Sequence, residues 1–261
     1  MCVAAIAWHA HPDWPLVAIG NRDEFHDRPA AALARWKDGS GIIAGRDLKS
    51  GGTWLGLSEA GRFVLVTNRR GFGDPQPNRV SRGSLVSDLL TANGKYGNPK
   101  SVRLDDFNPF NVLAVSEDDL HFLANRPDAI QTTLLPGIYG LSNGALDEPW
   151  PKTLALKAAL LDWLGHDSPN PGDLFAPLSS EAMPDVGLHP DEPSEIEEEA
   201  LGTAPFIRNA VYGTRCSTVV AVASSGQGII VERRFDAGGE VTGISEVAFR
   251  WPESTGEGEQ S

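Results

Sequence analysis

The chain has 261 residues, of which 41% are hydrophobic, and its 22 basic and 35 acidic residues give a net charge of −13. This length suits one large core, and the acidic balance without a basic stripe excludes the usual nucleic-acid binders. No apolar run approaches the ~20 residues that a membrane span needs, and the start lacks the basic flank of a signal peptide. We therefore expect a cytoplasmic protein with no nucleic-acid partner and no membrane span.

Cysteine usage points away from disulfides and metals. The chain contains only Cys2 and Cys216, which cannot form a disulfide framework. None of the six histidines falls at metal-ligand spacing beside either cysteine. We expect neither a metal nor a cofactor.

Hairpins and a few helices alternate along the chain. Apolar runs bounded by turn residues predict strands, and apolar residues three or four apart predict helices. In chain order these elements are a hairpin of strands 3–8 and 16–20, a hairpin of 53–57 and 62–67, a helix around 84–90, a hairpin of 111–115 and 120–124, a strand at 138–141, helices at 151–164, 173–183 and 195–201, a hairpin of 218–223 and 229–234, and a strand at 241–249. The pattern predicts an α+β fold with antiparallel sheets covered by helices. We expect one domain over 1–251 and a polar, disordered tail over 252–261.

The first hairpin predicts a reactive cluster at its open end. If Trp8 pairs with Pro15, Cys2 lies opposite Asn21, and Arg22 and Asp23 follow within one step. A slip of one residue would keep these groups close but would change the face that each side chain occupies. Local pairing alone thus brings a thiol, a guanidinium and a carboxylate together.

Cys2 becomes a nucleophile if the initiator Met1 is removed. Its free α-amine would titrate near pH ~8 and could take the proton of its own thiol. Arg22 would favour the thiolate, and Asp23 could orient the amine. These groups suit attack on an amide or another acyl carbon. The alternative is a small buried cysteine at the start of an edge strand, with residues 21–24 forming a salt-bridged hairpin end.

A series of motifs then runs in order through nearly the whole chain, from Cys2 to about Glu232. They are NRDEF at 21–25 with RP at 28–29, GGTWLG at 51–56, TN at 67–68, RG at 82–83 with LV at 85–86, YGLSN at 139–143, PW at 149–150 with Lys152, and YGTR at 212–215. Together they resemble the NRDE family, also called the transport and Golgi organisation protein 2 family. Each motif alone is weak, but their joint specificity is high.

That family is distantly similar to the N-terminal-nucleophile (Ntn) hydrolases that include penicillin V acylase and bile salt hydrolase. The resemblance implies a four-layer αββα sandwich of two antiparallel sheets flanked by helices. It also implies a catalytic set of Cys2 as nucleophile, Arg22, Asp23, Asn68, Asn143 and Arg215. The acylases space the first Arg and the Asp more widely than they stand here.

The two asparagines suit an oxyanion hole, in which one donor contributes roughly 2.7–4 kcal/mol. We rank Asn143 first and Asn68 second. Turn formation is the alternative for both, because asparagine often ends a strand. Arg215 lies in an apolar strand, so it needs a carboxylate partner or a substrate anion. Cys216 is expected on the opposite face from Arg215, in the core.

Other candidates are less direct. Trp54, between glycines that allow close packing, and Asn21 are expected at the substrate. Arg28 is expected to anchor a loop. The acidic stretch 182–204 is either a lid or a surface loop.

Two functions remain open. The first is hydrolysis of a linear amide or N-acyl carbon–nitrogen bond of a small molecule through a Cys2 acyl-enzyme. The second is a non-catalytic carrier for haem or an acyl ligand, because the family has been linked to haem trafficking and to lipid or acyl-CoA metabolism. A haem-like ligand would need an axial group such as His9, His11 or Cys2.

Overall fold

The strands form two antiparallel sheets. The computed structural model describes residues 2–167, 169–183, 185–187 and 204–252. A six-stranded sheet has the order β10-β1-β2-β11-β12-β13, and a seven-stranded sheet runs in sequence order from β3 to β9. The strands are β1 (Cys2–His11), β2 (Trp14–Phe25), β3 (Ala30–Arg35), β4 (Ile42–Asp47), β5 (Leu55–Ser58), β6 (Arg62–Asn68), β7 (Phe110–Ser116), β8 (Asp119–Ala124), β9 (Ile130–Leu134), β10 (Gly137–Leu141), β11 (Tyr212–Val222), β12 (Gln227–Phe235) and β13 (Val241–Arg250).

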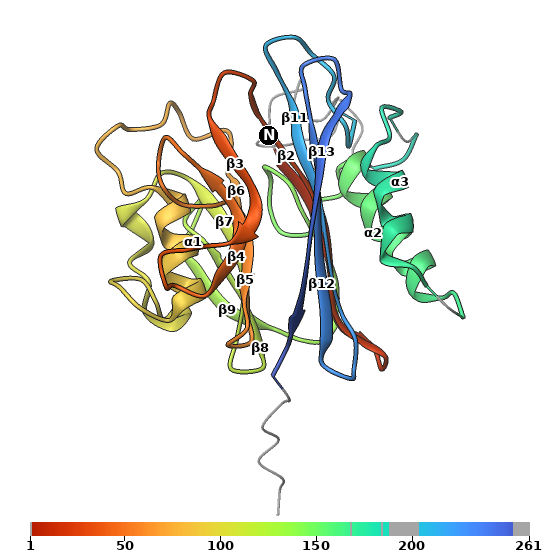
Figure 1. Ribbon diagram of the computed structural model, residues 1–261. Coiled ribbons are helices and arrows are strands. Elements are labelled where there is room, and N and C mark those ends of the chain that lie inside the picture. Colours follow the sequence, from red (N-terminus) through yellow and green to blue (C-terminus); the bar gives the residue numbers. More distant parts are fainter. Residues whose placement is uncertain (1, 168, 184, 188–203, 253–261) are drawn as a thin grey trace, which may run out of the picture.

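Helices cover the outer face of each sheet, so the predicted α+β, four-layer αββα arrangement is confirmed (Figure 1). The helix α1 (Arg82–Thr91) lies on the seven-stranded sheet, and α2 (Pro151–Leu164) and α3 (Phe175–Leu178) lie on the six-stranded sheet. Short 3₁₀ turns are η1 (Pro99–Ser101), η2 (Leu104–Asp106) and η3 (Pro171–Leu174). In the described part of the chain, no helix has both the length and the apolar character to cross a membrane.

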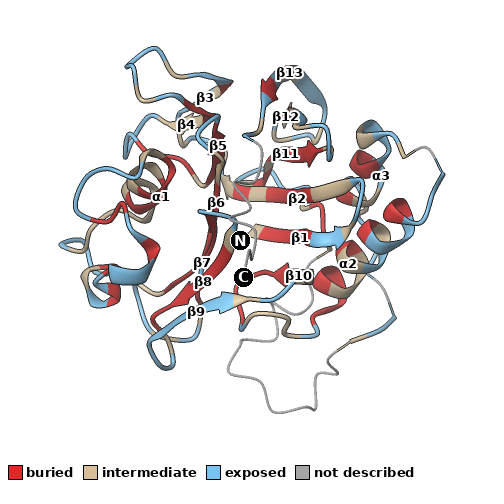
Figure 2. Cartoon of the chain, turned by 90° about the horizontal axis from the view of Figure 1, so that it is seen from below, coloured by how far each residue is buried: buried red, intermediate tan, exposed pale blue. Residues whose placement is uncertain are grey.

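Each boundary between layers holds its own apolar cluster. Strand alternation explains this, because successive side chains of β1 point to opposite faces. Ala4, Ile6 and Trp8 pack between the two sheets, whereas Val3 and Ala5 pack against α2 and α3. A third cluster joins the seven-stranded sheet to α1. Figure 2 shows the buried positions along both sheets and the exposed ones in the outer loops.

The N-terminal end of α1 is fixed by a close backbone contact. A Cβ added at Gly52 would lie 2.3 Å from the carbonyl carbon of Gly83, so only glycine permits this approach. The contact seats the first turn of α1 against the loop that carries Trp54. This confirms the expectation that the glycines around Trp54 serve close packing.

The predicted register of the first hairpin is wrong by one residue. Trp8 pairs with Leu16, and Cys2 therefore lies opposite Arg22, while Asn21 lies opposite Val3. The strands continue to His11 and Trp14 instead of ending in a long loop, and an irregularity between Trp8 and His11 absorbs one residue. The backbone of His9 has a positive φ of 44° within this irregularity. The segment 21–25 consequently lies inside β2 rather than after it.

Most of the other predicted elements are present, and the differences concern three strands and one helix. Strands β3, β4 and β9 were missed, and the helix expected over 173–183 is reduced to η3 and α3. Pro177 contributes to this, because proline has no backbone N–H to continue a helix. The helix expected over 195–201 lies outside the described residues.

Candidate active site

A cavity of about 770 Å³ opens between the two sheets, at the end where β1 begins. Its walls come from β1, β2, β11 and β12 of one sheet, from β4 and β6 of the other, and from the segment that leads into α1. This volume is within the range of small-molecule sites. The site candidates Cys2, Arg22, Asp23, Trp54, Asn68 and Arg215 line it.

A row of paired residues crosses the six-stranded sheet at the cavity. Cys2 pairs with Arg22, Arg22 pairs with Cys216, and Cys216 pairs with Arg234. Directly paired residues of neighbouring strands present their side chains on the same face. All four residues line the cavity, so the thiol of Cys2 lies next to a guanidinium on this face.

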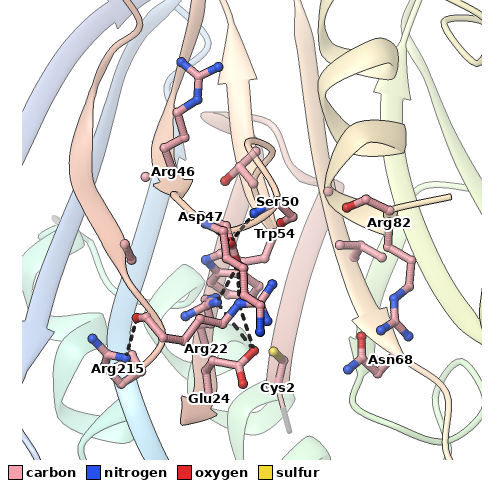
Figure 3. A pocket seen from close by; sticks show the side chains of 18 of the residues that line it. Cys2, Arg22, Glu24, Arg46, Asp47, Ser50, Trp54, Asn68, Arg82 and Arg215 are labelled. Atoms are coloured by element: carbon pink, nitrogen blue, oxygen red, sulfur yellow. Dashed lines mark hydrogen bonds and ion pairs between the residues drawn. The ribbon is translucent and has the colours of Figure 1, made fainter. Parts of the chain in front are cut away.

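Two arginines of the NRDEF region share two carboxylates. The Arg22 guanidinium lies 3.2 Å from Asp47 and 3.6 Å from Glu24, and Arg28 lies 2.6 Å from Asp47 and 3.7 Å from Glu24. Figure 3 shows this network beside Cys2. The network joins β2 to β4 and fixes the position of the Arg22 guanidinium. Asp47 belongs to none of the motifs, and no sequence pattern pointed to its role.

The half-buried thiol of Cys2 is held in its protonated form. Burial raises the pKa of the Cys2 thiol, and the charge of Asp23 raises it further, while Arg22 lowers it. Ser142 fixes the backbone at this point by donating to the Cys2 carbonyl over 2.8 Å. A thiol in this environment needs a base to react at neutral pH.

Asp23 and Lys152 are buried side chains of opposite charge, and each influences the pKa of the other. The Thr214 hydroxyl donates to the Asp23 carboxylate over 2.7 Å. Burial raises the pKa of Asp23 to about 6, and burial lowers the pKa of Lys152 to about 8 although Asp23 and Cys2 oppose that change. Both groups are therefore charged between about pH 6 and 8. Lys152 is fully buried on the first turn of α2, and its motif was recognised without a role for it.

Arg215 is the extra residue of a bulge in β11. The pairing of β11 with β2 shifts between Thr214 and Cys216. Both Arg215 and Cys216 consequently line the cavity, and the expected placement on opposite faces is wrong. The Arg215 guanidinium donates to the carbonyls of Phe25 (2.7 Å) and Arg28 (3.1 Å), so it holds the end of β2. Cys216 is buried, as predicted. This burial raises the pKa of its thiol well above the ordinary value.

The two asparagines adopt different roles. Asn68, at the end of β6, is exposed and lines the cavity across from Cys2 (Figure 3). Asn143 is buried and does not line the cavity, and its side-chain amide donates to the Asn68 carbonyl over 2.7 Å. Asn143, which the sequence analysis ranked first as oxyanion donor, therefore holds the backbone of Asn68 in position.

Asn21 faces the helical layer and lies outside the cavity lining. Its side-chain amide donates to the carbonyls of Leu178 (2.7 Å) and Pro205 (2.8 Å), and Ser217 donates to its side-chain oxygen over 2.6 Å. The one-residue difference in register accounts for this placement, because Asn21 and Arg22 occupy opposite faces of β2.

The two histidine candidates for a haem ligand lie outside the cavity lining. His9 and His11 lie at the turn end of β1, whereas Cys2 begins the strand. Seven residues of extended chain span roughly 23 Å. His9 and His11 therefore cannot act together with Cys2.

Arg79 and Arg82 also line the cavity, from the segment that leads into α1 and from its first residue. The sequence pointed to Arg82 only as part of a motif. No spacing rule connects it to Cys2, because β3 to β6 lie between them in the chain.

Comparisons with known proteins agree with this architecture. A mutant conjugated bile acid hydrolase from Clostridium perfringens has the same fold, with a TM-score of 0.52 and 7% identity over 95% of this chain and 92% of that one. At this identity the likeness shows the fold alone.

The sequence comparisons identify the family. A family model described as Transport and Golgi organisation 2 matches residues 1–237. The mouse Transport and Golgi organization 2 homolog is 30% identical over 259 residues, which cover 89% of this chain and 92% of the mouse protein. The human homolog is 31% identical with the same coverage. The chain therefore belongs to the Transport and Golgi organisation 2 family.

Proposed function

We propose that the chain is an N-terminal-nucleophile cysteine hydrolase that cleaves a linear amide or N-acyl carbon–nitrogen bond. The observation that carries this proposal is the direct pairing of Cys2 with Arg22 on the cavity face of the sheet. Cys2 is the first residue after the initiator Met1, so removal of Met1 would give its α-amine to the site. The amine is the base that the thiol, whose pKa burial raises, requires.

The proposed reaction has two steps. The α-amine of Cys2 takes the thiol proton while sulfur attacks the acyl carbon, and the carbon–nitrogen bond then breaks. The leaving nitrogen takes the proton from the ammonium group and departs as an amine, which leaves a Cys2 thioester. A water molecule, deprotonated by the same amine, then attacks the thioester and releases a carboxylic acid with the thiol restored.

Asn68 is the stronger candidate for the oxyanion donor. Its side chain is exposed to the cavity and makes no hydrogen bond to another described residue, whereas the amide of Asn143 is engaged with the Asn68 carbonyl. A donor that is free in the resting site can bind the developing negative charge without first losing a partner. This order reverses the ranking that the sequence suggested.

Asp23 is assigned a positioning role. At neutral pH its carboxylate is charged, since its pKa is about 6, and Thr214 fixes its orientation. A buried carboxylate beside the chain terminus would hold the ammonium form of the amine between the two steps. The proposed reaction is of the class named for the mutant conjugated bile acid hydrolase from Clostridium perfringens, with which the chain shares its fold.

Intact-mass spectrometry tests the proposal. The purified chain is measured before and after brief treatment with iodoacetamide at neutral pH, beside Cys2→Ala and Cys216→Ser. We expect loss of the Met1 mass and fast single labelling that is absent in Cys2→Ala and retained in Cys216→Ser. N-acyl substrates should then give a mass adduct on Cys2 that hydroxylamine removes.

Three results would contradict the proposal. One is a retained Met1, which leaves no α-amine on Cys2. Another is an acyl adduct that maps to Cys216. The third is labelling of Cys2 that is no faster than in the denatured chain.

A further inference from the structure

The cavity has a positive charge although the chain as a whole is acidic. The cavity lining holds eight basic residues and four acidic ones, in a chain of net charge −13. The basic residues are Arg22, Arg28, Arg46, Lys49, Arg79, Arg82, Arg215 and Arg234, and the acidic ones are Asp23, Glu24, Asp47 and Glu232. A recess with this excess of positive charge attracts anions.

Carboxylates neutralise half of these cations. Arg22 and Arg28 share Asp47 and Glu24, as described above. Arg46 lies 3.1 Å from Asp38, and Arg234 lies 3.7 Å from Glu232. These four arginines therefore already have anionic partners.

Arg79 and Arg82 have only neutral partners. Arg82 donates to the Pro109 carbonyl over 2.9 Å, and Arg79 donates to Gln76 (3.0 Å) and to the Asp105 carbonyl. Within the described part of the chain, no carboxylate lies at ion-pair distance from either guanidinium. Arg215 also donates only to carbonyls, those of Phe25 and Arg28. These two hydrogen bonds fix the end of β2, so we assign Arg215 a structural role.

The position of Arg82 makes its free charge significant. It lies half-buried at the start of α1, on the wall that faces Cys2 across the cavity (Figure 3). Burial lowers the pKa of Arg82, yet an arginine stays charged in proteins. A half-buried charge without a counter-ion is unfavourable, and a bound anion would relieve it. The first turn of α1 contains no acidic residue and adds the positive end of its dipole.

We propose that Arg82, with Arg79, binds an anionic group of the substrate whose acyl carbon Cys2 attacks. The substrate class is then an N-acyl compound that carries a carboxylate, sulfonate or phosphate. This inference rests on the proposed function for the identity of the reacting bond. The anion site itself rests only on the charges and partners described above.

The test uses two alkylating probes that differ in one charge. N-iodoacetylglycine is anionic, and N-iodoacetylglycinamide is its neutral counterpart with the same reactive group. In the full-length chain we expect the anionic probe to label Cys2 about tenfold faster, which is the effect of one charge-assisted hydrogen bond. This ratio should fall as salt increases, because the cavity is open to solvent.

Matched variants locate the effect. Arg82→Gln should reduce the ratio about tenfold, to near one, and Arg82→Lys should retain much of it. Arg46→Gln is the control, because Arg46 lines the same cavity but already has Asp38 as partner. Arg79→Gln provides a second variant if Arg82→Gln does not fold. An equal rate for both probes in the unmodified chain, or a ratio unchanged in Arg82→Gln and Arg79→Gln, would overturn the proposal.

Binding separates this proposal from the proposed function. If Cys2 reacts with neither probe faster than in the denatured chain, the hydrolase proposal fails and calorimetry then tests the anion site alone. Tighter binding of N-benzoylglycine than of N-benzoylglycinamide, lost in Arg82→Gln, would support the site. Equal binding of the two would overturn it. Competition by inorganic phosphate or by acetate then shows which anion the site prefers.

Discussion

Two walls of the cavity carry arginines in different settings. On the sheet wall, formed by the cavity face of β1 and β2 with Asp47 of β4, Arg22 and Arg28 are enclosed by carboxylates. On the α1 wall, formed by the segment 79–83, Arg79 and Arg82 bind neutral groups. The same side chain is thus a structural element on one wall and an available charge on the other. The hydrogen-bonding partner of each arginine determines its role, because a guanidinium that is already paired with a carboxylate attracts an anionic ligand less strongly.

The largest expected effect distinguishes Cys2, on the sheet wall, from Cys216, on the neighbouring strand β11. Both flank Arg22 in register. In the proposed mechanism, only Cys2 carries the α-amine that removal of Met1 would expose. Cys2→Ser should lower any acyl-transfer rate by at least about a thousandfold, because it removes the nucleophile. Cys216→Ser should leave the rate within about twofold, since burial keeps that thiol protonated. Equal loss in both variants, measured by steady-state hydrolysis, would show that Arg22 and not the terminus defines the site.

The second prediction tests the sheet wall by leaving its arginines with one carboxylate partner fewer, which makes them more like those of the α1 wall. Asp47→Asn removes the carboxylate that Arg22 and Arg28 share, and it should lower the free energy of unfolding by about 3 kcal/mol. Arg22 would gain an available charge, so the preference of Cys2 for the anionic probe should increase. Chemical denaturation and probe labelling measure the two effects.

The exposed pair of Asp38 and Arg46 gives the control for that prediction. Asp38→Asn should change the unfolding free energy by less than about 1 kcal/mol, because surface ion pairs contribute little. A similar loss in both variants would remove the distinction between the enclosed network and an ordinary surface pair.

The third prediction concerns the acid behind the sheet wall. The folded chain keeps a proton on Asp23 up to about pH 6, whereas the unfolded chain loses it near the ordinary pKa of 3.8. The folded state therefore binds more protons in this window, and its stability should fall as pH rises from about 4 to 6. The change from this group is on the order of 2–3 kcal/mol. Denaturation at several pH values should show this slope in the unmodified chain and its loss in Asp23→Asn, where the Thr214 hydroxyl keeps an acceptor.

The sequence pattern was sufficient for antiparallel sheets covered by helices because alternation is a local signal, whereas the four-layer arrangement was implied by the family resemblance. The period of two in β1 and the turn residues between hairpins are read directly from neighbouring residues. The motifs likewise identified Cys2, Arg22 and Asn68 as candidates, and the structure places all three at one cavity. Their roles in catalysis remain predictions.

Register and long-range partners were beyond the sequence. One irregularity after Trp8 moved Asn21 to the helical face, and one bulge at Arg215 brought Cys216 to the cavity. No residue type in the sequence marks either irregularity. A single inserted residue nevertheless changes the face of every residue that follows, so each irregularity altered several predicted placements. Asp47 was missed for a related reason: its partners are set by the pairing of distant strands.

The smallest expected effect tests how the α1 wall is held in place. Gly52→Ala would put a Cβ 2.3 Å from the carbonyl carbon of Gly83, and backbone on both sides leaves little room to adjust. We expect a loss of roughly 1–2 kcal/mol in unfolding free energy and a displaced first turn of α1. The reciprocal Gly83→Ala meets its nearest atoms only at 3.3 Å, so it should be tolerated better. If α1 positions Arg82 for the anion, Gly52→Ala should lower the labelling rate of the anionic probe more than that of the neutral probe. An equal decrease for both probes would mean that the sheet wall, and not α1, determines the preference for charge.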